Sequence, residues 1–236
     1  MNLRKQLLEI LYEDKSLLVV NKPSGITVAR ERENQRKSLM DLLVEIRPEL
    51  KQAGQYPRYG LVHRLDKETS GVLLIAKNNK TLSFLQKQFQ KREVKKTYLA
   101  LVYGKIFKDK GEIKSLIGRD RNNRLKQKAY LPIEPQAKKM KLREAVTFWE
   151  IKERFDQFTL LKVFPKTGRK HQIRVHLAFL GYPIVGDKLY ASGNVYPFSR
   201  LFLHCQEIII KILRGKHKKF LAPLPRELSV FLNKLK

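Results

Sequence analysis

The sequence predicts an α+β fold, with a mixed, largely antiparallel central β-sheet flanked by helices and loops. Two observations support this class. Short apolar runs typical of strands outnumber helical segments, and the two kinds follow each other irregularly instead of alternating as in a doubly wound fold. No Pro-, Ser- or Gly-rich linker divides the 236 residues, of which 42% are hydrophobic. We therefore predict a single domain, 1–236, long enough to bury a core.

The predicted strands are short apolar runs bounded by turn-forming residues. Residues 7–22 read as two strands around a turn at Asp14-Lys15, and Pro23-Ser24-Gly25 ends the second. Further strands are expected at 71–76, 97–102, 145–151, 158–164 and within 201–213. The basic segment 111–141 is weakly patterned, and no element is assigned to it.

The predicted helices have apolar residues at helical spacing, as in Leu82, Leu85 and Phe89. Gly181 is expected to end one of them. The charged segment 30–37 is expected to be a mobile loop. The four predicted helices cover 38–46, 80–91, 170–180 and 225–235.

The charge balance indicates a polyanionic partner. Fifty Lys and Arg against 22 Asp and Glu give a net charge of +28. Nucleic acid is the first candidate and an anionic membrane surface the second. The cations are scattered along the chain and no run approaches the ~18 apolar residues of a membrane span, which disfavours a membrane. A general basic bias of the source proteome is the bland alternative.

The cysteine content and the missing motifs exclude several classes of site. Cys205 is the only cysteine, so an intrachain disulfide and a CxxC zinc site are excluded. This fits a reducing, cytoplasmic location. The N-terminus is too polar for a signal peptide. GxGxxG, P-loop and GxSxG motifs are absent, so no nucleotide, metal or redox cofactor is expected.

The segment 61–71 is the first candidate for chemistry. Asp66 lies beside Arg64, just before an apolar strand. An arginine partner keeps an aspartate ionised, as a nucleophile requires. The alternative is a turn in which Asp66, Thr69 and Ser70 bond to nearby backbone N–H groups. Spacing alone favours the turn.

Two other segments have a functional and a structural interpretation. On the predicted helix, Arg174 shares a face with His171 and Leu177, so it could point inward, where a guanidinium would seek a carboxylate. The alternative, which the pattern alone favours, is a basic helix whose cations face phosphate. His171 and His176 are five residues apart, which does not suit a helical metal pair. Tyr98, on a predicted strand, is ordinarily a core residue.

Together these segments resemble one enzyme family. The runs Gly60-Leu61-Val62-His63-Arg64-Leu65-Asp66 and Thr69-Ser70-Gly71 are similar to the signature of the RluA branch of the RsuA/RluA-type pseudouridine synthases. The resemblance covers nearly the whole chain in the family's order. Ala29-Arg30 and Tyr182 depart from it, where many members carry His-Pro and His. Its other parts are the runs 12–14, 20–25, 76–77, 96–100, 117–120, 167–176, 181–187 and 203–204.

The resemblance implies an RNA pseudouridine synthase that isomerises specific uridines in tRNA, rRNA or both, without a cofactor. It implies Asp66 as the catalytic carboxylate, Arg174 as its ion-pair partner and Tyr98 as the ring that stacks on the target base. Arg64 is expected to enter the space left by the flipped base. No S4-type RNA-binding domain is expected in front. We also expect a monomer with a basic catalytic cleft. The remaining residues expected to contact RNA are His63, Arg169, Lys170 and His171.

Two other function classes stay open at this point. A basic RNA-binding module without catalysis explains the charge equally well. It does not explain why Asp66, Tyr98 and Arg174 all match family positions. A glycoside hydrolase using Asp66 and Glu68 would need two carboxyl groups facing one sugar, which their spacing does not ensure.

Overall fold

The structure is a computed structural model, and it describes residues 9–31, 36–134, 137, 140–191, 198–213 and 215–236. The chain forms two compact units. Unit 1 comprises Met1–Lys96 and Cys205–Leu224, and unit 2 comprises Thr97–His204 and Pro225–Lys236. The described residues form four α-helices and a mixed, mostly antiparallel sheet, which confirms the predicted fold class. The single domain stays a prediction.

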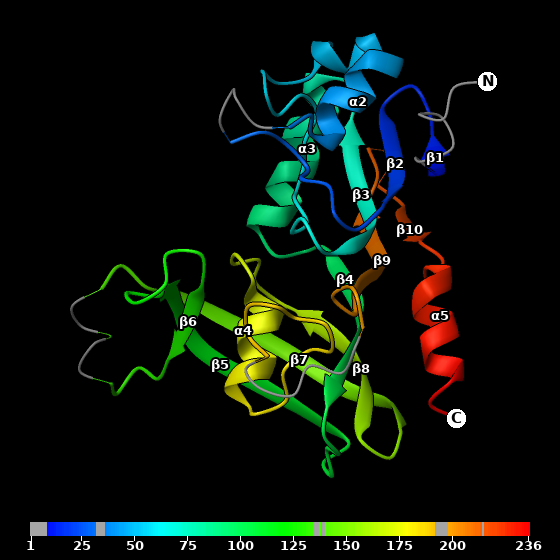
Figure 1. Cartoon of the computed structure of the whole chain (residues 1–236). Helices are drawn as coiled ribbons and strands as arrows, with labels where there is room; N and C mark the ends of the chain where they lie inside the picture. The colour runs from blue at the N-terminus through cyan, green and yellow to red at the C-terminus, as the bar shows by residue number, and fades with distance from the viewer. Residues whose placement is uncertain (1–8, 32–35, 135–136, 138–139, 192–197, 214) are drawn as a thin grey trace. The chain divides into compact units, whose positions relative to one another are not determined.

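Unit 1 contains an antiparallel arrangement of β1 with β2, β2 with β3, and β9 with β10 (Figure 1). All seven residues of β3 are buried, as are five of six in β2, because both strands are apolar on both faces. Its elements are β1 (Glu9–Glu13), β2 (Leu17–Lys22), α2 (Leu39–Ile46), η1 (Pro48–Gln52), β3 (Ser70–Ala76), α3 (Asn79–Gln90), the larger part of β9 (Leu203–Lys211) and β10 (His217–Leu221).

Gly71, at the start of β3, allows β3 to approach β9 closely. Its φ is +119°, a conformation that residues with a side chain rarely adopt. A Cβ atom at this position would lie 2.2 Å from the carbonyl oxygen of Cys205. Only glycine therefore fits at this second position of the strand that follows Asp66.

Unit 2 contains five antiparallel strands in the order β4-β8-β7-β5-β6 (Figure 1). Strand β4 starts in unit 1 and continues into unit 2. The elements are β4 (Lys95–Tyr103), β5 (Lys110–Arg119), β6 (Gln127–Tyr130), β7 (Arg143–Arg154), β8 (Phe158–Pro165), α4 (Gln172–Phe179) and α5 (Arg226–Asn233).

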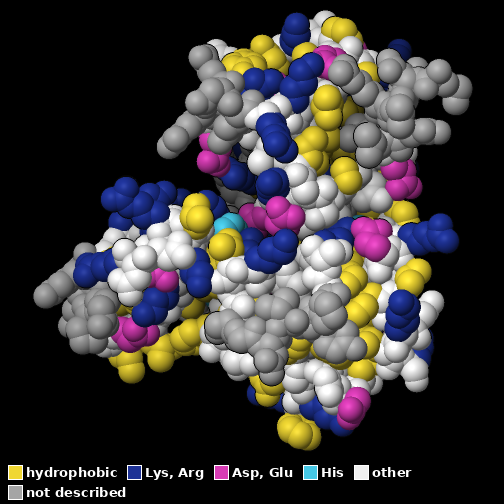
Figure 2. Space-filling model, in the orientation of Figure 1, with side chains coloured by type: hydrophobic (Ala, Val, Ile, Leu, Met, Phe, Trp, Pro, Cys, Tyr) yellow, Lys and Arg dark blue, Asp and Glu magenta, His cyan; other side chains and the backbone are white. Residues whose placement is uncertain are grey.

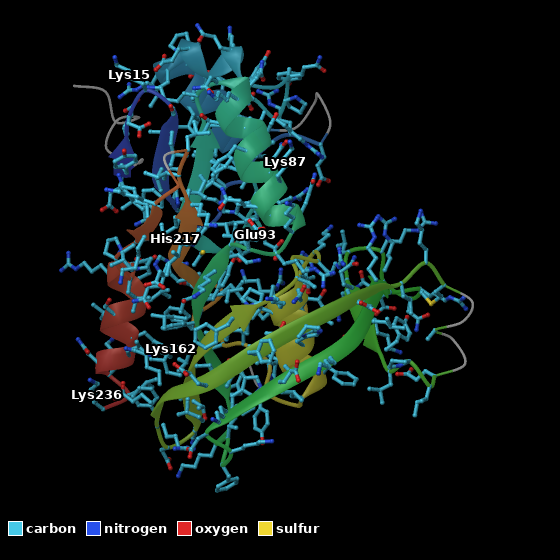
Figure 3. All side chains as sticks on the ribbon, turned by 180° about the vertical axis from the view of Figure 1, so that it is seen from behind. Lys15, Lys87, Glu93, Lys162, His217 and Lys236 are labelled. Atoms are coloured by element: carbon cyan, nitrogen blue, oxygen red, sulfur yellow. The ribbon has the colours of Figure 1, made fainter. Side chains whose placement is uncertain are left out.

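Helix α4 packs against one face of this sheet (Figure 1), and Lys162 on β8 can be seen from behind the sheet (Figure 3). Hydrogen bonds, in addition to apolar packing, fix helix α4 on the sheet. The His176 ring bonds Ser115 Oγ at 2.9 Å and Thr147 Oγ1 at 2.8 Å. Gln172 bonds Thr147 Oγ1 at 2.9 Å and the carbonyl of Val146 at 3.0 Å. Because each bond has one geometry, the helix is held in one rotation about its axis.

The structure adds elements that the sequence pattern did not predict. Strands β5 and β6 lie in the segment left unassigned, and β10 and η1 are also additional. In β5 the buried positions alternate as Ile113, Ser115 and Ile117, so a serine interrupts the apolar pattern. Helix α4 begins at Gln172, later than predicted, because His171 has a left-handed φ of 54°. Part of the expected mobile loop at 30–37 lies outside the described residues.

One source of pH-dependent stability is His176, which is fully buried. Burial lowers its pKa from 6.5 to about 4. Below pH 6.5 the unfolded chain takes up a proton that the folded chain rejects, so stability present above pH 6.5 is lost toward pH 4. We expect a loss of up to about 1.4 kcal/mol per pH unit from this residue. Urea unfolding at pH 7 and pH 5 should show a weaker pH dependence for His176→Gln.

A matched control is the exposed His217 on β10 (Figure 3). His217→Gln should keep the pH dependence of the unmodified protein. Other titrating groups are shared by all three proteins, so the difference isolates His176. An unchanged slope in His176→Gln would show that His176 is not the source.

Candidate active site

The segment before β3 presents Asp66 from a firmly anchored backbone. Val62 and Leu65 are buried, whereas Arg64 is exposed and Asp66 partly exposed. The backbone N–H of Thr69 donates to the Asp66 carbonyl at 3.1 Å, which closes a turn. The buried side chains of Val62 and Leu65 thus anchor the segment, while those of Arg64 and Asp66 reach the surface of unit 1.

The Asp66 carboxylate takes no part in this turn. Among the described residues of unit 1 we find no hydrogen bond or ion pair to it. The turn anticipated as a structural alternative is present, but backbone groups close it. The buried Thr69 Oγ1 likewise has no hydrogen-bond partner among the described residues. The carboxylate is therefore not needed to hold the turn.

Arg64 lies at the surface of unit 1. Its Nη2 donates to Glu31 at 3.0 Å, and the two side chains are 56% and 58% exposed. An exposed pair of this kind contributes roughly 0–1 kcal/mol. The side chain can exchange this partner for another anion at little cost.

Lys22 holds the turn from inside unit 1, a role that the sequence analysis did not assign. Its fully buried ammonium donates to the carbonyls of Pro23 at 2.8 Å and Lys67 at 3.1 Å. The Gly25 N–H donates to the Lys67 carbonyl at 2.9 Å, and Ser24 Oγ donates to the Glu68 carbonyl at 2.7 Å. The available signal was a lysine at the end of a strand that opens with four apolar residues.

Replacing Lys22 by methionine should loosen this turn. The variant keeps the apolar stem but removes charge-assisted bonds worth about 1.5–3 kcal/mol each. We expect reduced stability and, where the protein is folded, a fall in turnover larger than the fall in RNA affinity. Urea unfolding and single-turnover assays measure these effects. The exposed Lys15 (Figure 3) provides the control Lys15→Met, which should change neither. Normal turnover in Lys22→Met would contradict the role of Lys22 in holding the turn that carries Asp66.

His63 has a place in the packing of unit 1. Its Nε2 accepts a hydrogen bond from the Leu74 N–H at 3.1 Å, and its ring stacks on Phe89 at 4.8 Å. Burial, with a smaller contribution from the charge of Lys96, lowers the pKa of His63 to about 3. The ring is therefore neutral near pH 7. Its predicted contact with RNA stays a prediction, and it does not involve a cationic imidazole.

Arg174 in unit 2 forms a buried, bidentate ion pair with Asp187. Its Nε donates to Oδ2 at 2.7 Å and its Nη2 donates to Oδ1 at 2.8 Å. The two side chains are 6% and 0% exposed. This confirms the inference from the residues that an inward guanidinium would seek a carboxylate. The pairing of Arg174 with Asp66 joins residues of different units and stays a prediction.

The other predicted site residues of unit 2 lie on β4 and at the start of α4. Tyr98 is 9% exposed and lies opposite Val163, as expected of a core tyrosine. Its stacking on a base stays a prediction. Arg169 Nε donates to the Glu144 carbonyl at 2.9 Å, and His171 Nδ1 lies 2.9 Å from Tyr190 Oη. Lys170 is exposed. RNA contacts by these three residues stay predictions.

Exposed cations gather on the hairpin of β5 and β6. Figure 2 shows Lys and Arg side chains over the part of unit 2 that carries these strands. Around the turn of the hairpin the exposed cations are Arg119, Arg121, Arg124 and Lys128, and Lys110 and Lys114 are exposed farther along β5. The expected basic cleft stays a prediction. In the described part of the chain, no group of three or more His, Cys, Asp or Glu is placed to hold a metal ion. None of its helices is long and apolar enough to span a bilayer.

Comparison with known proteins gives consistent matches. Residues 16–179 match the model of a family described as RNA pseudouridylate synthase. The chain is 36% identical over 228 residues to the ribosomal large subunit pseudouridine synthase D of Borreliella burgdorferi, covering 95% of this chain and 67% of the relative. It is 39% identical over 202 residues to the dual-specificity RNA pseudouridine synthase RluA of Vibrio vulnificus, covering 85% and 76%.

A solved structure supports the same relationship. The human RNA pseudouridylate synthase domain containing 4 aligns with a TM-score of 0.76 at 26% identity. The alignment covers 99% of this chain and 95% of the human one. The similarity thus extends over both units and is not limited to the Asp66 motif.

Proposed function

The chain belongs to the RNA pseudouridylate synthase family, and from this premise we propose that it converts specific uridines in rRNA, tRNA or both to pseudouridine, with Asp66 as the catalytic residue. In this isomerisation the N1–C1′ bond breaks and a C5–C1′ bond forms. C5 loses its hydrogen as a proton, and N1 takes up a proton. The observation that carries the proposal is the Asp66 carboxylate, which stands on a rigid turn that does not use it.

Asp66 could attack the base, attack C1′ or abstract a ribose proton. All three roles require an ionised carboxylate at a fixed position. The bonds from Lys22, Ser24 and Gly25 to the following turn supply the fixed position. A group aimed in advance loses little entropy when the substrate binds. The anchored turn therefore supports catalysis by Asp66 over a purely structural role.

We assign supporting roles to three other side chains. Arg174 is the proposed partner that keeps Asp66 charged, and Tyr98 the ring that stacks on the target base. Arg64 is proposed to fill the space left by the flipped base, because extrusion of a base costs a few kcal/mol that some contact must offset. Its weak surface pair with Glu31 supports this role, since little is lost when the side chain moves.

The RNA class is proposed from the relatives and the charge. The Borreliella relative is named for the large ribosomal subunit, and the Vibrio relative is named dual-specificity. A net charge of +28 suits a folded RNA whose phosphates are contacted at many points. We propose the same classes of substrate for this chain, and expect it to act as a monomer.

The experiment uses RNA labelled with tritium at C5 of uridine. Purified protein, without added nucleotide and with metal chelated, should release tritium to water and yield pseudouridine on nucleoside chromatography. RNA from cells that lack the gene is the appropriate substrate, because its target uridines are unmodified. Tight RNA binding without any tritium release would overturn the proposal and favour a non-catalytic RNA-binding protein.

A further inference from the structure

Tyr190 contacts three residues that are distant from it in the sequence: Arg174, Gln127 on β6, and His171. It follows Asp187 by three residues and packs on the buried cluster of Ile117, Ala129, Ala145 and Val175. Its ring lies against Arg174, and its hydroxyl reaches both β6 and His171. No motif in the sequence marked this residue.

The ring face of Tyr190 completes the surroundings of Arg174. The guanidinium carbon lies over the ring, 5.1 Å from its centroid. Asp187 holds the guanidinium from another side, and its Oδ1 also accepts the backbone N–H groups of Leu189 at 3.0 Å and Tyr190 at 3.2 Å. The carboxylate and the ring thus belong to one short turn. Together they fix both the edge and the plane of the guanidinium.

The hydroxyl of Tyr190 has different partners. It accepts the backbone N–H of Gln127 at 2.8 Å and lies 2.9 Å from His171 Nδ1. Gln127 is the first residue of β6, the edge strand of the unit 2 sheet. An edge strand has no neighbouring strand to accept such an N–H. The hydroxyl therefore tethers the start of β6 to the start of α4.

This tether lies beside the turn of the basic hairpin, because Gln127 pairs with Arg119, the last residue of β5. The hairpin of β5 and β6 exposes Arg119, Arg121, Arg124 and Lys128. His171, the other partner of the hydroxyl, has a left-handed φ of 54°, a conformation unfavourable for a residue with a bulky side chain. The surrounding contacts hold it there, and the bond to Tyr190 is one of them. The hydroxyl thus fixes two groups on the side of unit 2 that carries the exposed cations.

We propose that Tyr190 is a positioning residue with two separable roles. Its ring orients Arg174 and thereby supports turnover, while its hydroxyl orders the β5–β6 hairpin and His171 and thereby supports RNA affinity. The first role rests on the proposed function, because it assumes that Arg174 assists the reaction. The second requires only that the protein binds RNA.

Two substitutions separate the roles. Tyr190→Phe keeps the ring and removes both hydroxyl bonds. We expect it to weaken RNA binding about fivefold, as the loss of about 1 kcal/mol predicts, with kcat changed less than twofold. Tyr190→Leu also removes the aromatic face. We expect the same weakening of binding together with a fall in kcat of at least about tenfold. Tyr56→Phe, at a half-exposed tyrosine of unit 1, is the control and should change neither quantity.

A double-mutant cycle tests whether the ring acts through Arg174. In an Arg174→Lys background, which lacks the planar guanidinium, Tyr190→Leu should lower kcat less than twofold further. Single-turnover measurements with saturating enzyme, at a temperature where circular dichroism shows every variant folded, remove effects of stability and binding. Equal losses of kcat in Tyr190→Phe and Tyr190→Leu, or independent losses in the cycle, would overturn the role of the ring.

The binding titration is independent of catalysis. Unchanged RNA affinity in Tyr190→Phe would overturn the role of the hydroxyl. An unmodified protein that binds RNA but releases no tritium would overturn the proposed function and with it the role of the ring, while the titration would still decide the role of the hydroxyl. Failure of the inference and failure of the proposed function are therefore distinguishable.

Discussion

Asp66→Asn should lower single-turnover pseudouridine formation at least about 1,000-fold, while the Kd for RNA changes less than about threefold. The amide has nearly the shape of the carboxylate but can neither act as a nucleophile nor accept a proton effectively. The turn should survive, because it is closed by the Thr69 N–H and held by Lys22. Tritium release and a binding titration on the same RNA measure the two quantities.

The control for this substitution lies in the same turn. Glu68→Gln also removes one negative charge, from a side chain that is 46% exposed and lies 3.9 Å from the Lys67 ammonium. It should keep turnover within a few-fold. Comparable losses in both variants would indicate a general effect of charge, and full turnover in Asp66→Asn would exclude Asp66 as the catalytic residue.

Asp187→Asn should lower the free energy of unfolding by about 3 kcal/mol, because it leaves the buried Arg174 charge without its counterion. For a chain of this length that corresponds to a fall in Tm of roughly 6–12 °C. Turnover should also fall at temperatures where the variant is folded, since the guanidinium loses its fixed orientation. Urea unfolding followed by circular dichroism measures the stability.

Asp156→Asn is the matched control. Its carboxylate pairs with Lys105 at 3.4 Å, but the two side chains are 90% and 51% exposed. Loss of such a pair should change stability by less than about 1 kcal/mol. The double variant Arg174→Met/Asp187→Leu should be less unstable than the sum of the single changes, because no unpaired charge remains buried. Additive losses would contradict a direct, buried pair.

Local signals predicted most helices and strands. Ser38 and Asp41 form a capping box at the start of α2, and Gly181 follows α4 with a φ of +84°. Such elements are set by neighbours in the chain. Strand β6 has four residues, and β10 has mostly polar ones, so both depend on pairing with a distant strand. Their stability comes from the sheet and leaves little pattern in the sequence.

The candidate site shows the same division. Helical spacing allowed an inward Arg174, but the pattern alone favoured a basic helix whose cations face phosphate. The sequence pattern could not identify Asp187 as the partner of Arg174. The two residues are 13 positions apart, and only the folded chain brings them together. Lys22 and Tyr190 act through contacts 45 and 63 residues away in the chain. Residues that support a site from a distance leave no local spacing to detect.

The most direct test of the central claim is a map of pseudouridines in total RNA from cells that lack the gene. The map is repeated after the gene is restored in its unmodified form and as Asp66→Asn, at equal protein levels. We predict that one or more uridines in rRNA or tRNA lose modification in the deletion, regain it with the unmodified gene and stay unmodified with Asp66→Asn. Full modification in the Asp66→Asn cells, or an identical map in the deletion, would contradict the claim.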